Sequence, residues 1–169
     1  WVPIAGRLGK HRAYCVANLI TAAAYVSLFF VPAGVVWPVL LSNVLMAFGN
    51  RGTMITPPAM TADAVDADEL ATGTAKMGGH MAFLASTFKF GMGLGLFAGL
   101  AFVSWFGYHD MSQVLTSEVE FGVRLGAAWL PAALLLLPIL IMWRYPIDAA
   151  SHAEIRQKLE QQRLARGNV

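Results

Sequence analysis

The sequence has little charge and a single cysteine. Only 13% of the residues are charged and 57% are hydrophobic, whereas soluble domains average about 25% charged residues. One cysteine, Cys15, excludes a disulfide or a multi-cysteine metal site within one chain. The charges gather at the edges of long apolar runs, a pattern typical of a polytopic helical membrane protein.

Recognisable catalytic motifs are also absent. The sequence shows no nucleophile–base pair, no phosphate-binding glycine loop and no redox motif, and its histidines fall in different segments. The acidic residues between Asp63 and Glu69 lack the central glycine and later glutamate of an EF-hand. We therefore expect no enzymatic activity, no metal site and no cofactor. The basic residues of the tail suit a helix at the membrane surface, so no nucleic-acid partner is expected.

The apolar runs predict an all-α membrane protein with four transmembrane helices. The expected spans are residues 13–31, 35–60, 78–106 and 123–143. In the second span, Pro57 and Pro58 each remove a backbone hydrogen bond, which predicts a break or a kink.

The segments outside the spans differ in charge. They are expected to be a basic loop at 1–12, an apolar turn at 31–37, an acidic loop at 61–77, a polar loop at 107–122 and a tail at 144–169. Within the tail, Ser151 and Glu154 fit a capping box that would begin a helix. The chain is thus divided into a leading loop, a four-helix part over 13–143 and the tail. It starts with Trp1 and no signal peptide precedes the first span, so we expect a fragment of a longer protein.

The distribution of lysine and arginine predicts the orientation. The segments 1–12 and 144–169 are rich in these residues, whereas 31–37 and 107–122 have none. Basic loops stay on the cytoplasmic side of a membrane. Both ends of the chain are therefore expected in the cytoplasm, as parts of a multi-pass protein of the cell membrane.

Lys89 is a charged residue in the middle of the third apolar run. At ~1.5 Å per helical residue it lies ~16 Å from Gly78, near the centre of a ~30 Å hydrocarbon core. An ammonium at this depth costs ~2.5–3.5 kcal/mol on insertion scales, so it should face a cavity or a partner. It could contact substrate, take part in ion coupling, or neutralise a carboxylate elsewhere. Arg51, ~14 Å from Met60, could face the same cavity and attract an acidic substrate, or instead pair with a carboxylate or reach water.

Glycines recur at every fourth position after Lys89. Gly91, Gly95 and Gly99 form a G-x-x-x-G-x-x-x-G pattern on the far face of the helix. Small residues let another helix approach closely, so this face is expected to be a packing seam. The alternative is that these glycines have no packing role, since glycine is common in membrane helices. Ser86 shares the face of Lys89, which is left for a substrate or coupling site.

The segment from residue 62 to residue 108 carries the most specific motif. It reads A-D-x-V-D-x-x-E-x-x-T-G, then a lysine, then a glycine-rich helix that ends in G-Y. The matching positions are Ala62, Asp63, Val65, Asp66, Glu69, Thr72, Gly73, Lys89, Gly107 and Tyr108. This segment resembles the region between the tenth and eleventh helices of the glycoside–pentoside–hexuronide:cation symporters, the melibiose-permease-like branch of the major facilitator superfamily. The opening R-L-G-K-H-R also resembles the superfamily's loop between the eighth and ninth helices.

The resemblance implies that the four spans are helices 9–12 of a twelve-helix transporter with a cytoplasmic C-terminal helix. Such a protein would move a sugar or glycoside together with a cation, sodium or a proton, by alternating access. The family's coupling-ion site is built from acidic residues of the amino-terminal half. The expected partners are therefore that half, a small sugar or glycoside, and the lipid bilayer.

The resemblance also implies that the acidic segment is a cytoplasmic gate, whereas its composition alone suits an ordinary solvated loop. The gate would use the carboxylates and basic residues Asp63, Asp66, Glu69, Arg7, Lys10 and Arg12. Two other functions are open at this point. One is a carrier of a lipid or another organic solute, since the fold does not fix the substrate. The other is a non-transporting membrane subunit or scaffold, which would not need Lys89 and Arg51 at the midplane.

Overall fold

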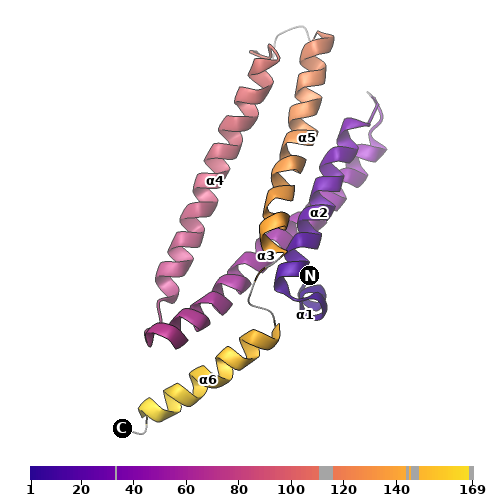
Figure 1. The fold of residues 1–169 in the computed structure, drawn as a ribbon. Helices are drawn as coiled ribbons and strands as arrows, with labels where there is room; N and C mark the ends of the chain where they lie inside the picture. Colours follow the sequence, from indigo (N-terminus) through magenta and orange to yellow (C-terminus); the bar gives the residue numbers. More distant parts are fainter. Residues whose placement is uncertain (33, 111–115, 144, 146–148, 168–169) are drawn as a thin grey trace.

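The computed structural model describes residues 1–32, 34–110, 116–143, 145 and 149–167. Over these residues the chain is all-α, with six helices and no strand (Figure 1). The helices are α1 (Val2–Leu8), α2 (Lys10–Phe29), α3 (Trp37–Thr72), α4 (Met77–Trp105), α5 (Ser117–Met142) and α6 (Ala149–Gly167). The expected fold class is confirmed. Parts of the turn at 31–37, of the polar loop at 107–122 and of the tail at 144–169 lie outside the described residues.

The helix α2 packs against both α3 and α5 and forms the centre of the bundle. It buries a row of small residues, among them Ala13, Ala17 and Ala24. A Cβ atom added to Gly49 of α3 would overlap Thr21 Oγ1 of α2. Small side chains therefore set the short distance between α2 and α3, as is common in membrane helices.

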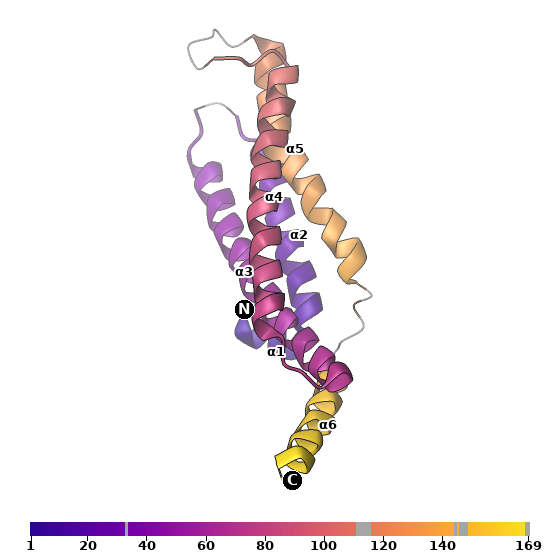
Figure 2. The ribbon, with the colours of Figure 1, turned by 90° about the vertical axis from the view of Figure 1, so that its left-hand side faces the viewer.

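The helix α3 is longer than expected, because the segment predicted to be an acidic loop at 61–77 is helical up to Thr72. This segment is rich in alanine, which favours the helical state strongly. The helix also continues through Pro57 and Pro58, so these residues do not break it. Figure 2 shows that its axis changes direction along its length. It ends at Gly73, whose φ of 75° is the left-handed conformation that closes many helices.

The segment at 1–12 was also predicted to be a loop. This prediction is wrong as well, because the segment is helical. Pro3 lies in the first turn of α1, where its missing N–H costs no hydrogen bond. Gly9, with a φ of 87°, separates α1 from α2. Trp1 Nε1 donates a hydrogen bond to Phe48 O at 2.7 Å, which holds the start of α1 against α3.

The helices α4 and α5 lie close together beside the connection that joins them and diverge toward their other ends (Figure 1). At the close end, a Cβ atom added to Gly122 would overlap Phe106, and one added to Gly126 would lie 2.9 Å from Phe102 Cδ1. Elsewhere α4 is open, and none of its residues is buried by the described part of the chain. Most of its surface is thus left for contacts that this part of the chain does not supply.

Among the described residues, three helices are long and apolar enough to cross a membrane: α2, α4 and α5. They correspond to the expected first, third and fourth spans. The expected second span, in α3, is not among them, because Asn43, Asn50 and Arg51 lower its mean hydropathy. Several apolar helices in one chain indicate a multi-pass membrane protein.

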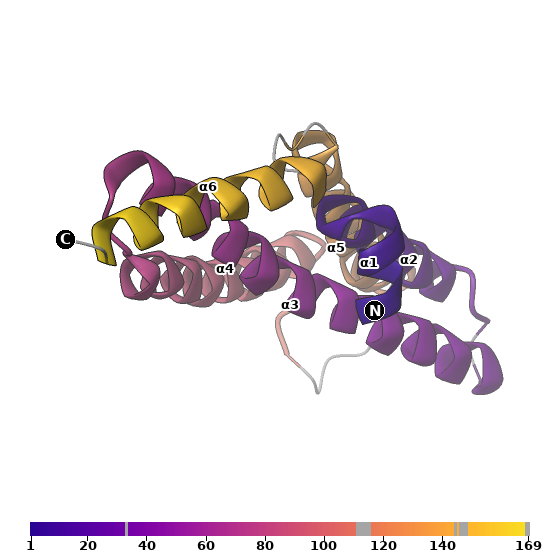
Figure 3. The same cartoon turned by 90° about the horizontal axis from the view of Figure 1, so that it is seen from below.

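The tail is helical, as expected, and α6 lies alongside the C-terminal half of α3 (Figures 1 and 3). The helix begins at Ala149, so Ser151 lies inside it and the predicted capping box does not start it. Glu154 accepts a hydrogen bond from Lys158 Nζ at 2.6 Å, and this bond lowers the pKa of Glu154. The end of α3, the start of α4 and α6 lie toward one end of the molecule; the end of α2, the start of α3, the end of α4 and the start of α5 lie toward the other (Figure 1).

Candidate functional site

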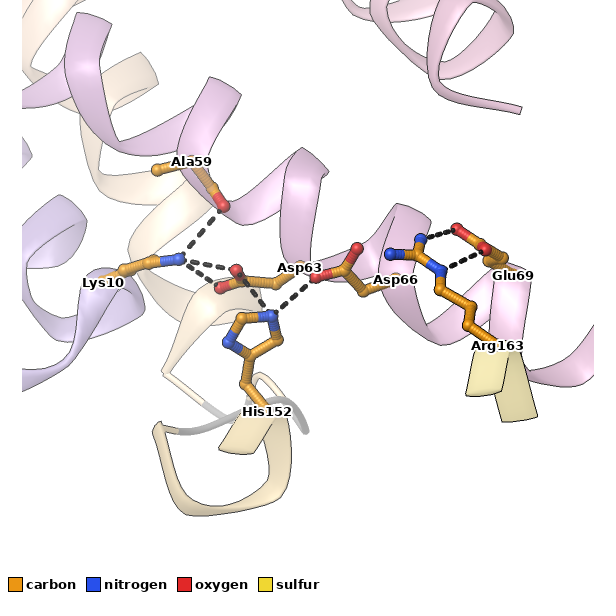
Figure 4. A network of polar contacts seen from close by, with 7 residues as sticks. All are labelled: Lys10, Ala59, Asp63, Asp66, Glu69, His152 and Arg163. Atoms are coloured by element: carbon orange, nitrogen blue, oxygen red, sulfur yellow. Dashed lines mark hydrogen bonds and ion pairs between the residues drawn. The ribbon is translucent and has the colours of Figure 1, made fainter. Parts of the chain in front are cut away.

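Six ionisable side chains from α2, α3 and α6 meet at the α6 end of the molecule (Figure 4). We call this set the α3–α6 cluster, and its members are Lys10, Asp63, Asp66, Glu69, His152 and Arg163. The three carboxylates follow one another at intervals of three residues, so they lie along one side of α3. The α3–α6 cluster exists because α3 remains helical beyond its prolines.

Asp63 is the most buried carboxylate of the cluster. Its side chain is 9% exposed, and Lys10 Nζ lies 2.6 Å and 2.7 Å from its two carboxylate oxygens. The same ammonium donates to Ala59 O at 3.3 Å. Lys10 is the first residue of α2. The ion pair therefore fastens the start of α2 to the C-terminal half of α3.

His152 connects α6 to two carboxylates of α3. Its Nε2 atom lies 3.2 Å from Asp63 Oδ1 and 3.1 Å from Asp66 Oδ2, and its side chain is 19% exposed. A ring nitrogen must carry a proton in order to donate to a carboxylate. The position of Nε2 between two oxygens therefore favours the tautomer or charge state with a proton on that atom.

Arg163 makes a forked contact farther along α6. Its Nε donates to Glu69 Oε1 at 3.1 Å, and its Nη2 donates to Glu69 Oε2 at 2.7 Å. This geometry is the one in which a guanidinium binds a carboxylate best. The hydrogen bonds to Glu69, and then its charge, raise the pKa of Arg163. The Arg163 side chain is 61% exposed, so solvent screens the pair and its contribution to stability is small.

Two aromatic rings lie near the α3–α6 cluster. His11 is buried, and its Nδ1 atom has no hydrogen-bond partner among the described residues. The centroid of its ring lies 6.3 Å from that of Tyr145, which follows α5. Burial raises the pKa of Tyr145, and the charge of Asp63 raises it further. The phenol of Tyr145 therefore stays protonated at neutral pH.

The α3–α6 cluster contains part of the predicted gate. Lys10 pairs with Asp63, one of the pairings that the sequence analysis anticipated. Arg7 and Arg12 are exposed, and neither forms an ion pair with a described residue. Whether these residues act as a gate remains a prediction.

The other partners of the acidic side chains were not predicted from the sequence. Asp66 contacts His152, and Glu69 contacts Arg163. A signal was available, because the basic tail and the acidic segment were expected on the same side of the membrane. The specific pairs could be identified only once α3 was known to stay helical and to run beside α6.

Within the described chain, no hydrogen bond or ion pair joins the predicted substrate or coupling residues to one another or to the cluster. Lys89 on α4 and Arg51 on α3 are exposed, and neither has an ion pair or hydrogen bond with a described residue; Ser86 is exposed as well. An unpaired cation within a bilayer is costly. Lys89 and Arg51 therefore need a counter-charge, a polar ligand or water that this part of the chain does not supply.

The predicted glycine seam packs against no other helix of the described chain. Apart from the nearby backbone of α4 itself, no atom lies within 4 Å of a Cβ atom built on Gly91, Gly95 or Gly99. Its packing role remains a prediction about a helix outside the described chain. The close approach of α4 and α5 uses Gly122 and Gly126 instead, and the G-x-x-x-G spacing of this pair is the sequence signal for that contact.

A cavity of about 320 Å³ lies near the α3–α6 cluster, between α3, α4 and the end of α5. Its walls are mainly apolar and include Pro57, Met60, Phe83, Thr87 and Tyr145. Lys89 and Arg51 do not line it. In the part of the chain that the structure describes, no three histidine, cysteine, aspartate or glutamate side chains are grouped so as to hold a metal ion.

Comparison with known families identifies the fold. Residues 1–149 match the model of the family described as MFS/sugar transport protein. The chain belongs to this family. The match extends over all the helices that were expected to span the membrane. It confirms the resemblance to carbohydrate:cation symporters and places the chain among carriers rather than enzymes.

Two curated relatives are similar over nearly the whole chain. The glucuronide carrier protein homolog of Escherichia coli (strain K12) is 29% identical over 168 residues, which cover 94% of this chain and 36% of that protein. An uncharacterized symporter of Synechocystis sp. is 30% identical over 165 residues, which cover 95% of this chain and 30% of that protein. The chain thus spans about a third of the length of these relatives. No solved structure gave a significant match.

Proposed function

We propose that the full-length protein is a secondary active transporter for a sugar or glycoside and a cation, and that this chain supplies part of its carboxy-terminal half. The observation that carries the proposal is Lys89, an ammonium in the apolar helix α4 without a partner in the described chain. A scaffold would gain nothing from a charge at this depth, whereas a transport pathway needs polar groups there. The amino-terminal half, a substrate or both would supply the counter-charge.

An acidic glycoside is the substrate that the charges favour. Lys89 and Arg51 are both cations in helices of the bundle, and a carboxylate on the substrate would balance one of them. The name of one relative, a glucuronide carrier protein homolog, describes such a substrate class for that protein. The coupling ion in this proposal is sodium or a proton.

The α3–α6 cluster is the gate in this mechanism, with both ends of the chain in the cytoplasm. Its ion pairs would hold the cytoplasmic end closed while the transporter faces outward and would separate when it opens inward. Each exposed pair contributes little by itself. Several pairs acting together are enough to bias two conformations that differ by a few kcal/mol.

The test is uptake by the full-length protein in sealed vesicles. Labelled glucuronides and neutral glycosides would be offered with an imposed sodium gradient, with an imposed proton gradient and with neither. We expect accumulation of an acidic glycoside driven by one gradient and abolished when that gradient is collapsed. Folded protein that accumulates no glycoside under any gradient would contradict the proposal and favour a carrier of another solute or a scaffold.

A further inference from the structure

We propose that Asn43 and Asn50, on the side of α3 turned away from α2, select the substrate by its hydroxyl groups. Arg51 binds the carboxylate of an acidic glycoside, Asn50 binds the hydroxyl beside that carboxylate, and Asn43 binds a more distant part of the glycoside. The inference rests on the proposed function and deepens it, because it names side chains that would recognise the sugar.

Helical spacing places the three polar side chains on one side of α3. At about 100° per residue, Asn43 and Asn50 differ by ~20° around the helix axis, and Arg51 lies ~100° from Asn50. All three are exposed in the described chain. The other side of α3 packs against α2, since Cβ atoms built on Gly49 and Gly52 would overlap side chains of that helix.

This polar side of α3 does not suit contact with lipid. The three residues lie within the expected span at 35–60, and α3 is not among the helices that are apolar enough to cross a membrane by composition. An amide or a guanidinium in hydrocarbon finds no hydrogen-bond partner, which is costly. This side of α3 is therefore expected to face a polar ligand, water or polar groups of another helix.

The polar atoms on this side are largely unused. The Asn50 side chain forms no hydrogen bond with a described residue. Asn43 Nδ2 donates to Val39 O at 2.8 Å, which uses one N–H and leaves Oδ1 as an acceptor. Arg51 has no ion pair with a described residue. The side thus offers donors, acceptors and one positive charge.

This combination of groups matches the chemistry of a sugar acid. A side-chain amide both donates and accepts hydrogen bonds, as a hydroxyl does. A guanidinium binds a carboxylate with two parallel hydrogen bonds. An anionic solute without hydroxyl groups would leave the two amides unsatisfied, which lowers affinity. The amides therefore favour a hydroxylated substrate, and Arg51 favours one with a carboxylate.

The order of the residues along α3 assigns the contacts. Asn50 is the neighbour of Arg51, so its amide can reach the hydroxyl nearest to the bound carboxylate, which in a hexuronide is the 4-hydroxyl. Asn43 lies ~10 Å from Asn50 along the helix axis, so it contacts a different part of the glycoside. The proposed function leaves open which cation binds the carboxylate, and the neighbouring amides favour Arg51 over Lys89.

The experiment measures equilibrium binding of methyl β-glucuronide and of its 4-deoxy analogue to the purified full-length protein in nanodiscs, with sodium present and no gradient. In the wild type, loss of the 4-hydroxyl should weaken binding about three- to tenfold, the effect of one neutral hydrogen bond. Asn50→Ala should weaken binding of the glucuronide by a similar factor. It should leave binding of the deoxy analogue unchanged, because that hydrogen bond is already missing.

Asn43→Ala is the matched control, since it removes the same amide from the same side of α3, two turns away. It should weaken binding of both ligands by about the same factor. Asn50→Ala that weakens both ligands equally, or neither of them, would overturn the assignment of Asn50. A wild-type protein that binds no glucuronide would overturn the inference as a whole.

A second measurement keeps both asparagines in place. Ala47 is exposed and lies between them on the same side of α3. With Cys15 and any other native cysteine replaced, a hydrophilic thiol reagent should label Ala47→Cys. Methyl β-glucuronide at roughly ten times its Kd should slow this labelling about tenfold.

Leu134→Cys, at an exposed leucine in the middle of the apolar helix α5, is the control for labelling. It should stay unreactive with or without the ligand, because a thiol in apolar surroundings does not ionise. An unreactive Ala47→Cys would show that this side of α3 faces lipid or another helix. Labelling of Ala47→Cys without protection by the glucuronide would show that the sugar binds elsewhere. Either result would overturn the inference.

Neither measurement depends on transport. Gradient-driven accumulation of a glycoside by a protein that lacks the expected binding pattern would reject this inference alone. The expected binding pattern in a protein that accumulates no glycoside under any gradient would reject the proposed function alone.

Discussion

Lys10 Nζ lies 2.6 Å from Asp63 Oδ1, although the two residues are 53 positions apart in the sequence. The partners are buried unequally, since the Asp63 side chain is 9% exposed and the Lys10 side chain is 39% exposed. Loss of the lysine leaves a nearly buried carboxylate without its cation, whereas loss of the carboxylate leaves a lysine that can turn toward water. The two truncations should therefore differ in cost.

The first prediction is that Lys10→Met destabilises the full-length protein more than Asp63→Asn. The expected loss for Lys10→Met is ~1–2 kcal/mol, below that of a fully buried unpaired charge, because the site is partly exposed and His152 remains. Thermal unfolding in detergent measures the difference. Arg12→Met, at an exposed arginine without an ion pair, is the control and should have no effect. Equal destabilisation by both truncations would contradict the assigned burial.

The second prediction tests the α3–α6 cluster as a gate. Neutralising Asp66→Asn and Glu69→Gln together removes two contacts between α3 and α6, so the inward-open population should grow. A cysteine at Ser86 should then be labelled faster from the cytoplasm. The change in thermal stability should be modest, because the Arg163 side chain of one contact is 61% exposed and the His152–Asp66 contact is partly exposed. Glu160→Gln, at an exposed glutamate of α6, serves as the control. Labelling that is unchanged in the double variant would reject the gate.

The main helices could be predicted from the sequence because their apolar runs exceed what a soluble helix needs. The expected third span at 78–106 differs from α4 by a single residue at each end. The prediction of a loop for the acidic segment was wrong for a physical reason. Its alanines favour a helix, whereas its closely spaced carboxylates suit a solvated loop. The helical state is accompanied by contacts with α6, which is distant in sequence. The local amino-acid composition gives no information on those contacts.

The pairs within the α3–α6 cluster could be predicted only in part, for a related reason. The positive-inside rule acts on whole segments, and it placed the segment of Lys10 on the same side of the membrane as that of Asp63. It could not distinguish Lys10 from Arg7 or Arg12, since that choice depends on which side of α2 faces α3. The same limit applies to glycine: spacing predicted a seam on α4, which stays a prediction, whereas the close contact in this chain lies at Gly122.

The third prediction concerns that contact. Gly122→Ala should destabilise the protein by ~1–3 kcal/mol, because the new Cβ would overlap Phe106 and force α4 and α5 apart. Gly126→Ala should cost less, since its Cβ would lie 2.9 Å from a ring atom of Phe102 that can shift slightly. Thermal unfolding of both variants tests this order.

A comparison on α4 extends this prediction to the seam. In the full-length protein, Gly95→Leu should reduce folding more than Gly93→Leu, because Gly95 lies on the predicted packing face and Gly93 near the Lys89 face. Normal yields of Gly95→Leu with a selective loss of transport would contradict the packing role.

The fourth prediction is the orientation of the chain. Ser117 begins α5 at one end of the molecule, and Gln161 lies in α6 at the other end. An impermeant thiol reagent should therefore modify Ser117→Cys only from outside the cell and Gln161→Cys only from the cytoplasm. Both positions are exposed, so their reactivity should be similar once the reagent reaches them. Modification of both from the same side would exclude the proposed topology.

The fifth prediction concerns Lys89, on which the transport proposal depends. Lys89→Ala should abolish gradient-driven uptake or uncouple it from the ion, while membrane insertion improves, because removing a midplane charge saves ~2.5–3.5 kcal/mol on insertion scales. Expression and thermal stability should therefore be maintained, which separates a functional loss from misfolding. Lys76→Ala, at an exposed lysine before α4, is the matched control and should transport normally.

The kind of transport defect that Lys89→Ala causes distinguishes the possible roles of Lys89. If the ammonium binds the carboxylate of an acidic glycoside, Lys89→Ala should raise the KM for that substrate more than for a neutral glycoside. If it takes part in ion coupling, both substrates should lose their gradient dependence together. If it only neutralises a carboxylate in the amino-terminal half, replacement of that carboxylate should restore transport in the Lys89→Ala background. Unchanged uptake and unchanged ion dependence in Lys89→Ala would show that α4 carries its charge for none of these purposes.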